Sequence, residues 1–185
     1  MDIFSHGLWA GAAYKAINKK TAKPLNTRLA VFWGVFPDLF AFAIPFAWLF
    51  WNLIFGGLKF SDVPGPHEGE PPPQDRFWVF HLATILYNLS HSLIIFLIVF
   101  CVFWLILRRP FWELGGWFLH ILIDIPTHTY KFYPTPFLWP VSSWKLDGFS
   151  WGTPWFLVWN YIFIVIIFWW LKKDKGKPRH EKTTR

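Results

Sequence analysis

One nine-residue segment, His120-Ile-Leu-Ile-Asp-Ile-Pro-Thr-His128, carries the strongest indication of chemistry in this chain. His120 and Asp124 are four residues apart, so on a helix their side chains point to the same face. An imidazole and a carboxylate placed in this way can bind one divalent cation. The neighbouring residues are apolar enough for a bilayer, where ionisable groups are costly to bury and usually functional. The segment therefore predicts part of a metal site within a membrane helix.

Other ionisable side chains fall at a similar expected depth in the membrane. Counted from the nearest basic residues at about 1.5 Å per residue, four of them lie roughly 13 to 26 Å from the cytoplasmic edge. These four are His6, Asp38, His91 and His120, and Asp124 lies one turn beyond His120. Helical bundles build metal sites from inward carboxylates and imidazoles of separate helices. The alternative, single hydrogen bonds in a polar seam, explains one buried histidine better than it explains five such groups.

The types of side chain in this set limit the metal and the reaction. Imidazole and carboxylate ligands without thiolate favour Zn²⁺, with Mn²⁺ or Fe²⁺ as alternatives. A cation with an open coordination position lowers the pKa of a bound water, which can attack an ester or phosphoester. Asp38 or Asp124 could then also act as the general base. The sequence has no P-loop or dinucleotide fingerprint that would indicate other chemistry.

The composition indicates a polytopic membrane protein. Of the 185 residues, 54% are hydrophobic and 23% aromatic, which is more than a soluble domain of this size carries. The net charge of +7 comes from basic clusters outside the apolar runs, so it fits the positive-inside rule better than nucleic-acid binding. We therefore expect no nucleic-acid partner. The single cysteine, Cys101, excludes an internal disulfide and a cysteine-based zinc site.

The pattern of apolar runs predicts an all-α fold, a polytopic membrane helical bundle of four long helices plus a short N-terminal helix. The short helix is expected over 2–17, and the long ones over 29–57, 77–107, about 110–126 and 154–171. Residues 1–171 would form a single membrane-embedded helical domain, and residues 172–185 a basic cytoplasmic tail. The basic loops and the tail fall on one side, which predicts a multi-pass protein of the inner (plasma) membrane with these parts cytoplasmic.

Five short motifs occur in a particular order along the chain. They are Ser5-His6-Gly7, Pro37-Asp38-Leu39, Ser90-His91-Ser92, His120-Ile-Leu-Ile-Asp124 and Leu138-Trp139-Pro140. This ordered set resembles the YdjM-like family of inner-membrane, predicted metal-dependent hydrolases. The resemblance implies that the metal ligands are His6, Asp38, His91, His120 and Asp124. The run from His120 to His128 is also remotely similar to the metal-ligand helix of the zinc-dependent phospholipase C and single-strand nuclease superfamily, which implies phosphodiester or phospholipid chemistry.

These observations together predict a membrane-bound metal-dependent hydrolase that acts on a phosphoester or ester bond of a lipid-like substrate, with membrane lipids as partners. The alternative is a non-catalytic metal-binding membrane scaffold or an ion-handling protein. Phe40 and Leu86 favour this alternative, because the family commonly has an acidic residue and a histidine at these positions. The direction of His128 stays open, since Pro126 is expected to end the helix before it.

Overall fold

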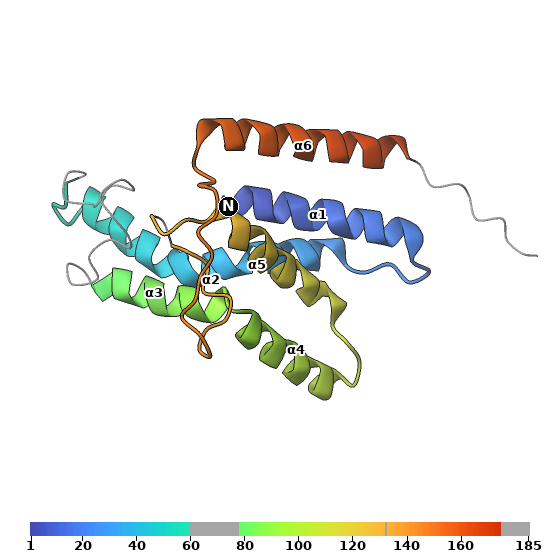
Figure 1. Ribbon diagram of the computed structural model, residues 1–185, viewed down its shortest axis with the longest axis horizontal. Coiled ribbons are helices and arrows are strands. Elements are labelled where there is room, and N and C mark those ends of the chain that lie inside the picture. The colour runs from blue at the N-terminus through green and yellow to red at the C-terminus, as the bar shows by residue number, and fades with distance from the viewer. Residues whose placement is uncertain (60–77, 132, 175–185) are drawn as a thin grey trace, which may run out of the picture.

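The fold is an all-helical bundle built around one central helix. The computed structural model describes residues 1–59, 78–131 and 133–174, and the regular secondary structure in these ranges is helical. The helices are α1 (Ile3–Lys20), α2 (Thr27–Ile54), α3 (Trp78–Ser90), α4 (Leu93–Leu107), α5 (Gly115–Thr127) and α6 (Pro154–Lys173), with a short 3₁₀ turn (Trp112–Leu114) before α5. Helix α2 packs against α1, α3 and α5, while α6 packs on α1 at the edge of the bundle (Figure 1). The predicted all-α bundle is thus confirmed.

The number and lengths of the helices differ from the expectation. The run expected over 77–107 is two helices, α3 and α4, bent by 61° at a short break. Ser92 caps α4 there, because its Oγ accepts hydrogen bonds from the amides of Ile94 and Ile95 at 3.1 and 3.2 Å. Helix α5 has 13 residues, so its length of about 20 Å is less than the roughly 30 Å hydrocarbon core.

The described part of the chain therefore offers fewer membrane spans than the four expected. Helices α2 and α6 are long and apolar enough to cross a membrane, and the bent pair α3–α4 would make a third span. Helix α1 extends to Lys20 rather than to residue 17, and α6 extends to Lys173. Most of the segment between the helices expected over 29–57 and 77–107, and the predicted tail from residue 175 onward, lie outside the described residues.

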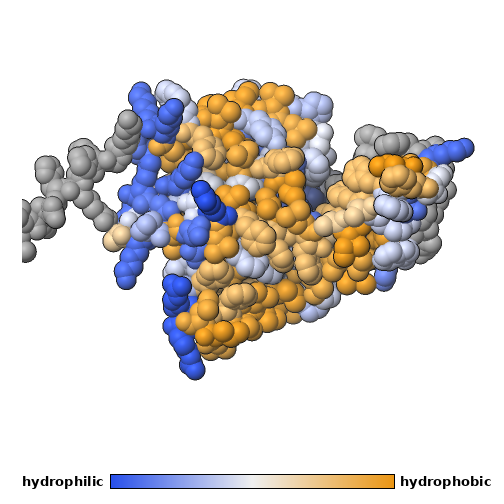
Figure 2. Space-filling view, turned by 180° about the vertical axis from the view of Figure 1, so that it is seen from behind, coloured by the Kyte–Doolittle hydropathy of each residue, from blue (hydrophilic) through white to orange (hydrophobic). Residues whose placement is uncertain are grey.

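The surface has the two features expected of a membrane protein. Large apolar side chains are exposed along α2, α4 and α6, among them Phe50, Leu105 and Val165. Figure 2 shows an apolar face that ends in a strongly hydrophilic region on one side. On that side lie the C-terminal ends of α1, α4 and α6, together with the N-terminal end of α2 (Figure 1). Basic residues follow or precede each of these helix ends in the sequence. This gathering of cations at one end is the pattern that the positive-inside rule describes.

Small residues allow α1, α2 and α5 to approach closely. A Cβ added to Gly116 would lie 2.1 Å from the carbonyl oxygen of Ala30, and one added to Gly34 would lie 2.7 Å from the Cβ of Ala10. Small residues are the usual means of close helix packing in membranes, because lipid supplies no hydrophobic force between helices. The close packing matters for function, since these three helices carry four of the five predicted site residues.

Replacing Gly116 with valine should destabilise the bundle by about 1–3 kcal/mol or more, because the α2 backbone cannot retreat from the new side chain. Thermal unfolding of the detergent-solubilised protein, followed by circular dichroism, measures this as a lower Tm. Gly152→Val is the matched control, since the nearest neighbouring atom to an added Cβ there is the Oγ of Ser150 at 3.9 Å. Equal Tm values for the two variants would contradict the close approach of α2 and α5.

Candidate metal centre

Four ionisable side chains converge inside the bundle. They come from α2 (Asp38), the break between α3 and α4 (His91), and α5 (His120 and Asp124). One possible ligand atom from each lies within 4.8 Å of the other three. The two imidazoles and Asp124 are fully buried, whereas the side chain of Asp38 is 15% exposed. Three distant segments of the chain therefore bring four potential metal ligands to one point.

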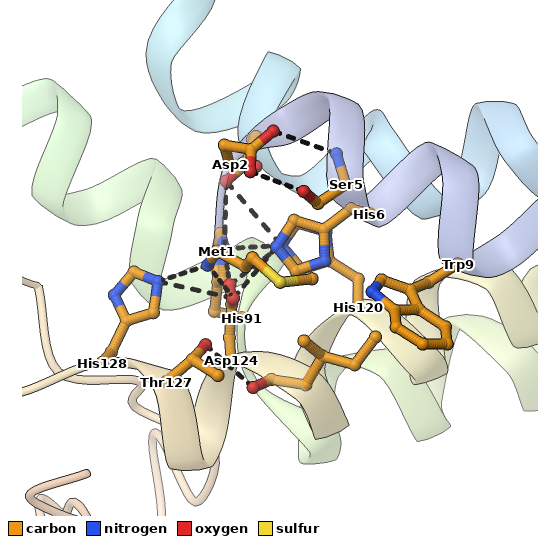
Figure 3. A network of polar contacts seen from close by, with 12 residues as sticks. Met1, Asp2, Ser5, His6, Trp9, His91, His120, Asp124, Thr127 and His128 are labelled. Carbon is orange, nitrogen blue, oxygen red and sulfur yellow. Dashed lines mark hydrogen bonds and ion pairs between the residues drawn. The ribbon is translucent and has the colours of Figure 1, made fainter. Parts of the chain in front are cut away.

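Asp124 lies at the centre of the cluster, and its two oxygens face different imidazoles. Its Oδ2 is 3.1 Å from Nε2 of His120 and 3.4 Å from Nε2 of His91. Its Oδ1 is 3.0 Å from Nε2 of His6 and 3.4 Å from Nε2 of His128 (Figure 3). A single carboxylate thus connects all of the imidazoles in the cluster.

The orientation of two imidazoles follows from hydrogen bonds to backbone carbonyls. Nδ1 of His120 donates to the carbonyl of Gly34 at 2.7 Å, whereas Nδ1 of His91 lies 2.9 Å from the hydroxyl of Ser90 and 3.2 Å from the carbonyl of Tyr87. We assign the ring proton of His120 to Nδ1 because a carbonyl oxygen can only accept, while the Ser90 hydroxyl can pair with either tautomer of His91. Nε2 of His120 then directs its lone pair into the cluster, which is the usual arrangement of a metal-binding histidine.

The donor set fits a divalent cation. The Nε2 atoms of His91 and His120 are only 3.0 Å apart, so the two imidazoles can hold one proton or one metal cation between them. Oδ1 of Asp38 is 3.6 and 3.7 Å from the same two nitrogens. The buried Oδ2 of Asp124 has no hydrogen-bond partner. Two nitrogen and two carboxylate ligands in a buried site are a combination that Zn²⁺ and related ions bind.

His6, the fifth predicted ligand, lies beside this four-residue group on the other side of Asp124. Its ring stacks on that of His120 with 3.7 Å between the ring centres. Both of its ring nitrogens are buried and make no hydrogen bond, although Nε2 is 3.0 Å from Oδ1 of Asp124. The structure therefore brings all five predicted residues into one cluster, and a role of His6 as a ligand stays a prediction.

A hydrogen-bonded network fixes the start of α1 next to His6. The Oγ of Ser5 donates to Asp2 at 2.5 Å and accepts from the amide of Asn160 at 2.7 Å, and Asn160 in turn accepts from the indole of Trp9 at 2.9 Å. Figure 3 shows Asp2, Ser5 and Trp9 along the helix that carries His6. The network links α1 to α6 at a depth where unpaired polar groups would be costly.

Sequence reasoning left the direction of His128 open, and the structure turns it toward the cluster. Helix α5 continues through Pro126 to Thr127, so His128 lies one turn after Asp124. Its Nδ1 donates to the carbonyl of Tyr133 at 2.8 Å, which leaves Nε2 facing Asp124. The spacing of four residues between Asp124 and His128 was the feature of the sequence that indicated this direction. The α-amino group of Met1 also donates to Oδ1 of Asp124. The sequence analysis did not find this contact, because it considered only side chains and this is a backbone group.

A loop from later in the chain holds the end of α5 in place. The amide of Gly148 donates to the carbonyl of His128, and the amide of Phe149 donates to that of Pro126, both at 2.8 Å. These bonds satisfy carbonyls that a helix end leaves unpaired. A Cβ on Gly148 would lie 2.2 Å from the carbonyl oxygen of Pro126, so the loop can approach this closely only with glycine at that position.

Comparison of the chain with protein families, with curated proteins and with solved structures found no match. The resemblance to YdjM-like hydrolases therefore stays a prediction from the motifs. The evidence for the site is the geometry of its own residues, which together could hold a metal ion within a bundle of membrane-type helices.

Proposed function

We propose that this protein is a membrane-bound metal-dependent hydrolase, of the YdjM-like kind, that cleaves a phosphoester or ester bond of a lipid-like substrate. The observation that carries the proposal is the convergence of four ligand atoms within 4.8 Å of one another among apolar helices. A divalent cation bound there, with Zn²⁺ the first candidate and Mn²⁺ or Fe²⁺ the alternatives, would polarise the scissile bond and lower the pKa of a bound water.

The distances between the four clustered side chains, and their exposed fractions, suggest a role for each of them. His91, His120 and Asp124 would hold the cation, since Oδ2 of Asp124 is within 3.4 Å of both Nε2 atoms. Asp38 would be the general base that accepts the proton of the attacking water. Its Oδ1 is farther from both imidazoles, and it is the most exposed of the four side chains. Three protein ligands leave one position open, as in catalytic rather than structural zinc sites.

The surroundings of Asp38 favour a substrate that resides in the membrane. Leu39 and Phe40, the next two residues of α2, are 44% and 41% exposed. A lipid-like substrate could approach Asp38 across this apolar surface without leaving the bilayer. We further propose that the protein resides in the inner (plasma) membrane with its basic end cytoplasmic, because basic segments are retained on that side.

Burial favours a second candidate function, a metal-stabilised scaffold or ion-handling protein without hydrolase activity. Three of the four clustered side chains are no more than 1% exposed. If Asp38 also bound the cation, the site would have four protein ligands and no open position, which is typical of structural zinc.

Metal removal separates the two candidates. Detergent-purified hydrolase should contain about one divalent cation per chain by element analysis. It should hydrolyse a phospholipid or a chromogenic phosphodiester, lose this activity on chelation, and regain it when Zn²⁺ or Mn²⁺ is added. A scaffold would contain the cation and show a lower Tm after chelation, but no turnover of any substrate in the panel. Protein that contains no cation and does not bind added Zn²⁺ would contradict both.

A further inference from the structure

A groove of about 940 Å³ runs along the outside of the bundle between α1 and α6. The two helices lie side by side and run in the same direction (Figure 1). The walls of the groove are mainly apolar, with Leu8 on one helix and Ile164, Val165 and Phe168 on the other. From Leu8 to Lys19 the groove follows α1 for about 16 Å, roughly half of the 30 Å hydrocarbon core. Its length therefore matches one leaflet of a bilayer.

Lysines line the end of the groove at the basic side of the molecule. Lys15, Lys19 and Lys172 all belong to its lining, and Nζ of Lys15 is 4.8 Å from the ring centre of Phe168. Lys19 donates to the backbone carbonyl of Asp174 and lies 3.3 Å from the carboxylate of the same residue. Among the residues that the structure describes, neither Lys15 nor Lys172 has a carboxylate within ion-pair distance. These two positive charges are therefore not neutralised by a described carboxylate and can attract an anion.

We propose that this groove binds a phospholipid with an anionic headgroup from the leaflet at the basic end of the protein. The headgroup phosphate lies between Lys15 and Lys172, and one acyl chain extends over Phe168 toward Leu8. Anionic lipids are attracted to lysines at the membrane surface, whereas a zwitterionic lipid would satisfy only the apolar part of the groove. The site is separate from the metal centre, because His6 points into the bundle while Leu8 lines the outer groove.

The proposal is tested by native mass spectrometry of the detergent-solubilised protein, titrated with phosphatidylglycerol and with phosphatidylcholine of the same acyl chains. Phosphatidylglycerol should bind at concentrations at least tenfold lower. The double variant Lys15→Gln/Lys172→Gln should bind phosphatidylglycerol roughly 30-fold more weakly, while its affinity for phosphatidylcholine changes little. Its metal content should equal that of the wild type, so this result is independent of the hydrolase proposal.

Two further variants separate the groove from a general charge effect. Lys20→Gln/Lys23→Gln removes the same charge from exposed lysines that do not line the groove, so it should keep the preference for phosphatidylglycerol. Val165→Trp fills the groove without changing charge, so it should weaken the binding of both lipids. Equal wild-type affinities for the two lipids, an equal loss in the Lys20/Lys23 variant, or displacement of the lipid by inorganic phosphate would each overturn the proposal.

Discussion

Replacing Asp124 with asparagine is expected to remove the bound divalent cation from the protein. Both carboxylate oxygens face imidazole nitrogens at 3.0 to 3.4 Å, and the neutral amide would put an N–H group at one of these positions. Loss of an outer-shell partner alone costs about 10- to 100-fold in metal affinity, so loss of this central ligand should cost at least about 100-fold. Element analysis of the purified variant, and competition with a chelator of known affinity, measure the effect.

Asp147→Asn is the matched control for this substitution. The Asp147 carboxylate is exposed, and its hydrogen-bond partner is the amide of Tyr130 at 2.9 Å rather than an imidazole of the cluster. That variant should keep its cation. His120→Ala removes a different donor and should also lose the metal, whereas His81→Ala, at an exposed position on α3, should not. Retention of the cation in both Asp124→Asn and His120→Ala would show that this cluster is not a metal site.

Asp38→Asn is expected to abolish most of the hydrolysis while the cation stays bound. An amide of the same shape cannot accept a proton from water, and a positioned general base contributes about 10²- to 10⁴-fold to a reaction rate. His91, His120 and Asp124 remain in place to hold the metal. Turnover of a phospholipid or chromogenic phosphodiester, measured beside metal content and Tm, tests whether only the rate falls.

The outcome of this substitution distinguishes the proposed role of Asp38 from the alternatives. If Asp38→Asn loses the cation, then Asp38 is a fourth ligand and the closed site of a scaffold becomes the better description. If the variant keeps both cation and full activity, the general base is another group. Asp147→Asn again serves as the control, since it makes the same chemical change on the exposed surface.

The sequence predicted where the helices lie better than it predicted where a helix is interrupted. Long apolar runs predict helices because backbone groups in lipid must be paired within the segment. The boundaries of α1 and α2 lie within three residues of those expected. The break at His91 was not predicted, because serines are tolerated in apolar helices. The capping role of Ser92 becomes visible only once the chain bends there.

The sequence predicted which residues form the candidate site, but it did not predict all of the bonds that orient their side chains. Helical spacing places Asp124 on the same face as His120, and counting from the basic residues correctly brings residues from three other segments to the same depth. The direction of His128 could not be derived in this way. It depends on the bond from Nδ1 of His128 to the carbonyl of Tyr133, and on bonds from Gly148 and Phe149, which lie some 20 residues later and pair with the end of α5. Local sequence contains no information about such long-range partners.

The interruption between α3 and α4 does more than change the course of the chain. In an unbroken helix the carbonyl of Ser90 would be used by the amide of Ile94, but here that amide binds the hydroxyl of Ser92 instead. The released carbonyl accepts from the indole of Trp117 at 2.6 Å, which ties α5 to the bend. In an uninterrupted helix the carbonyl of Ser90 would already be paired, and it could not accept from the indole of Trp117. The break between α3 and α4 therefore links the segment that carries His91 to the helix that carries His120.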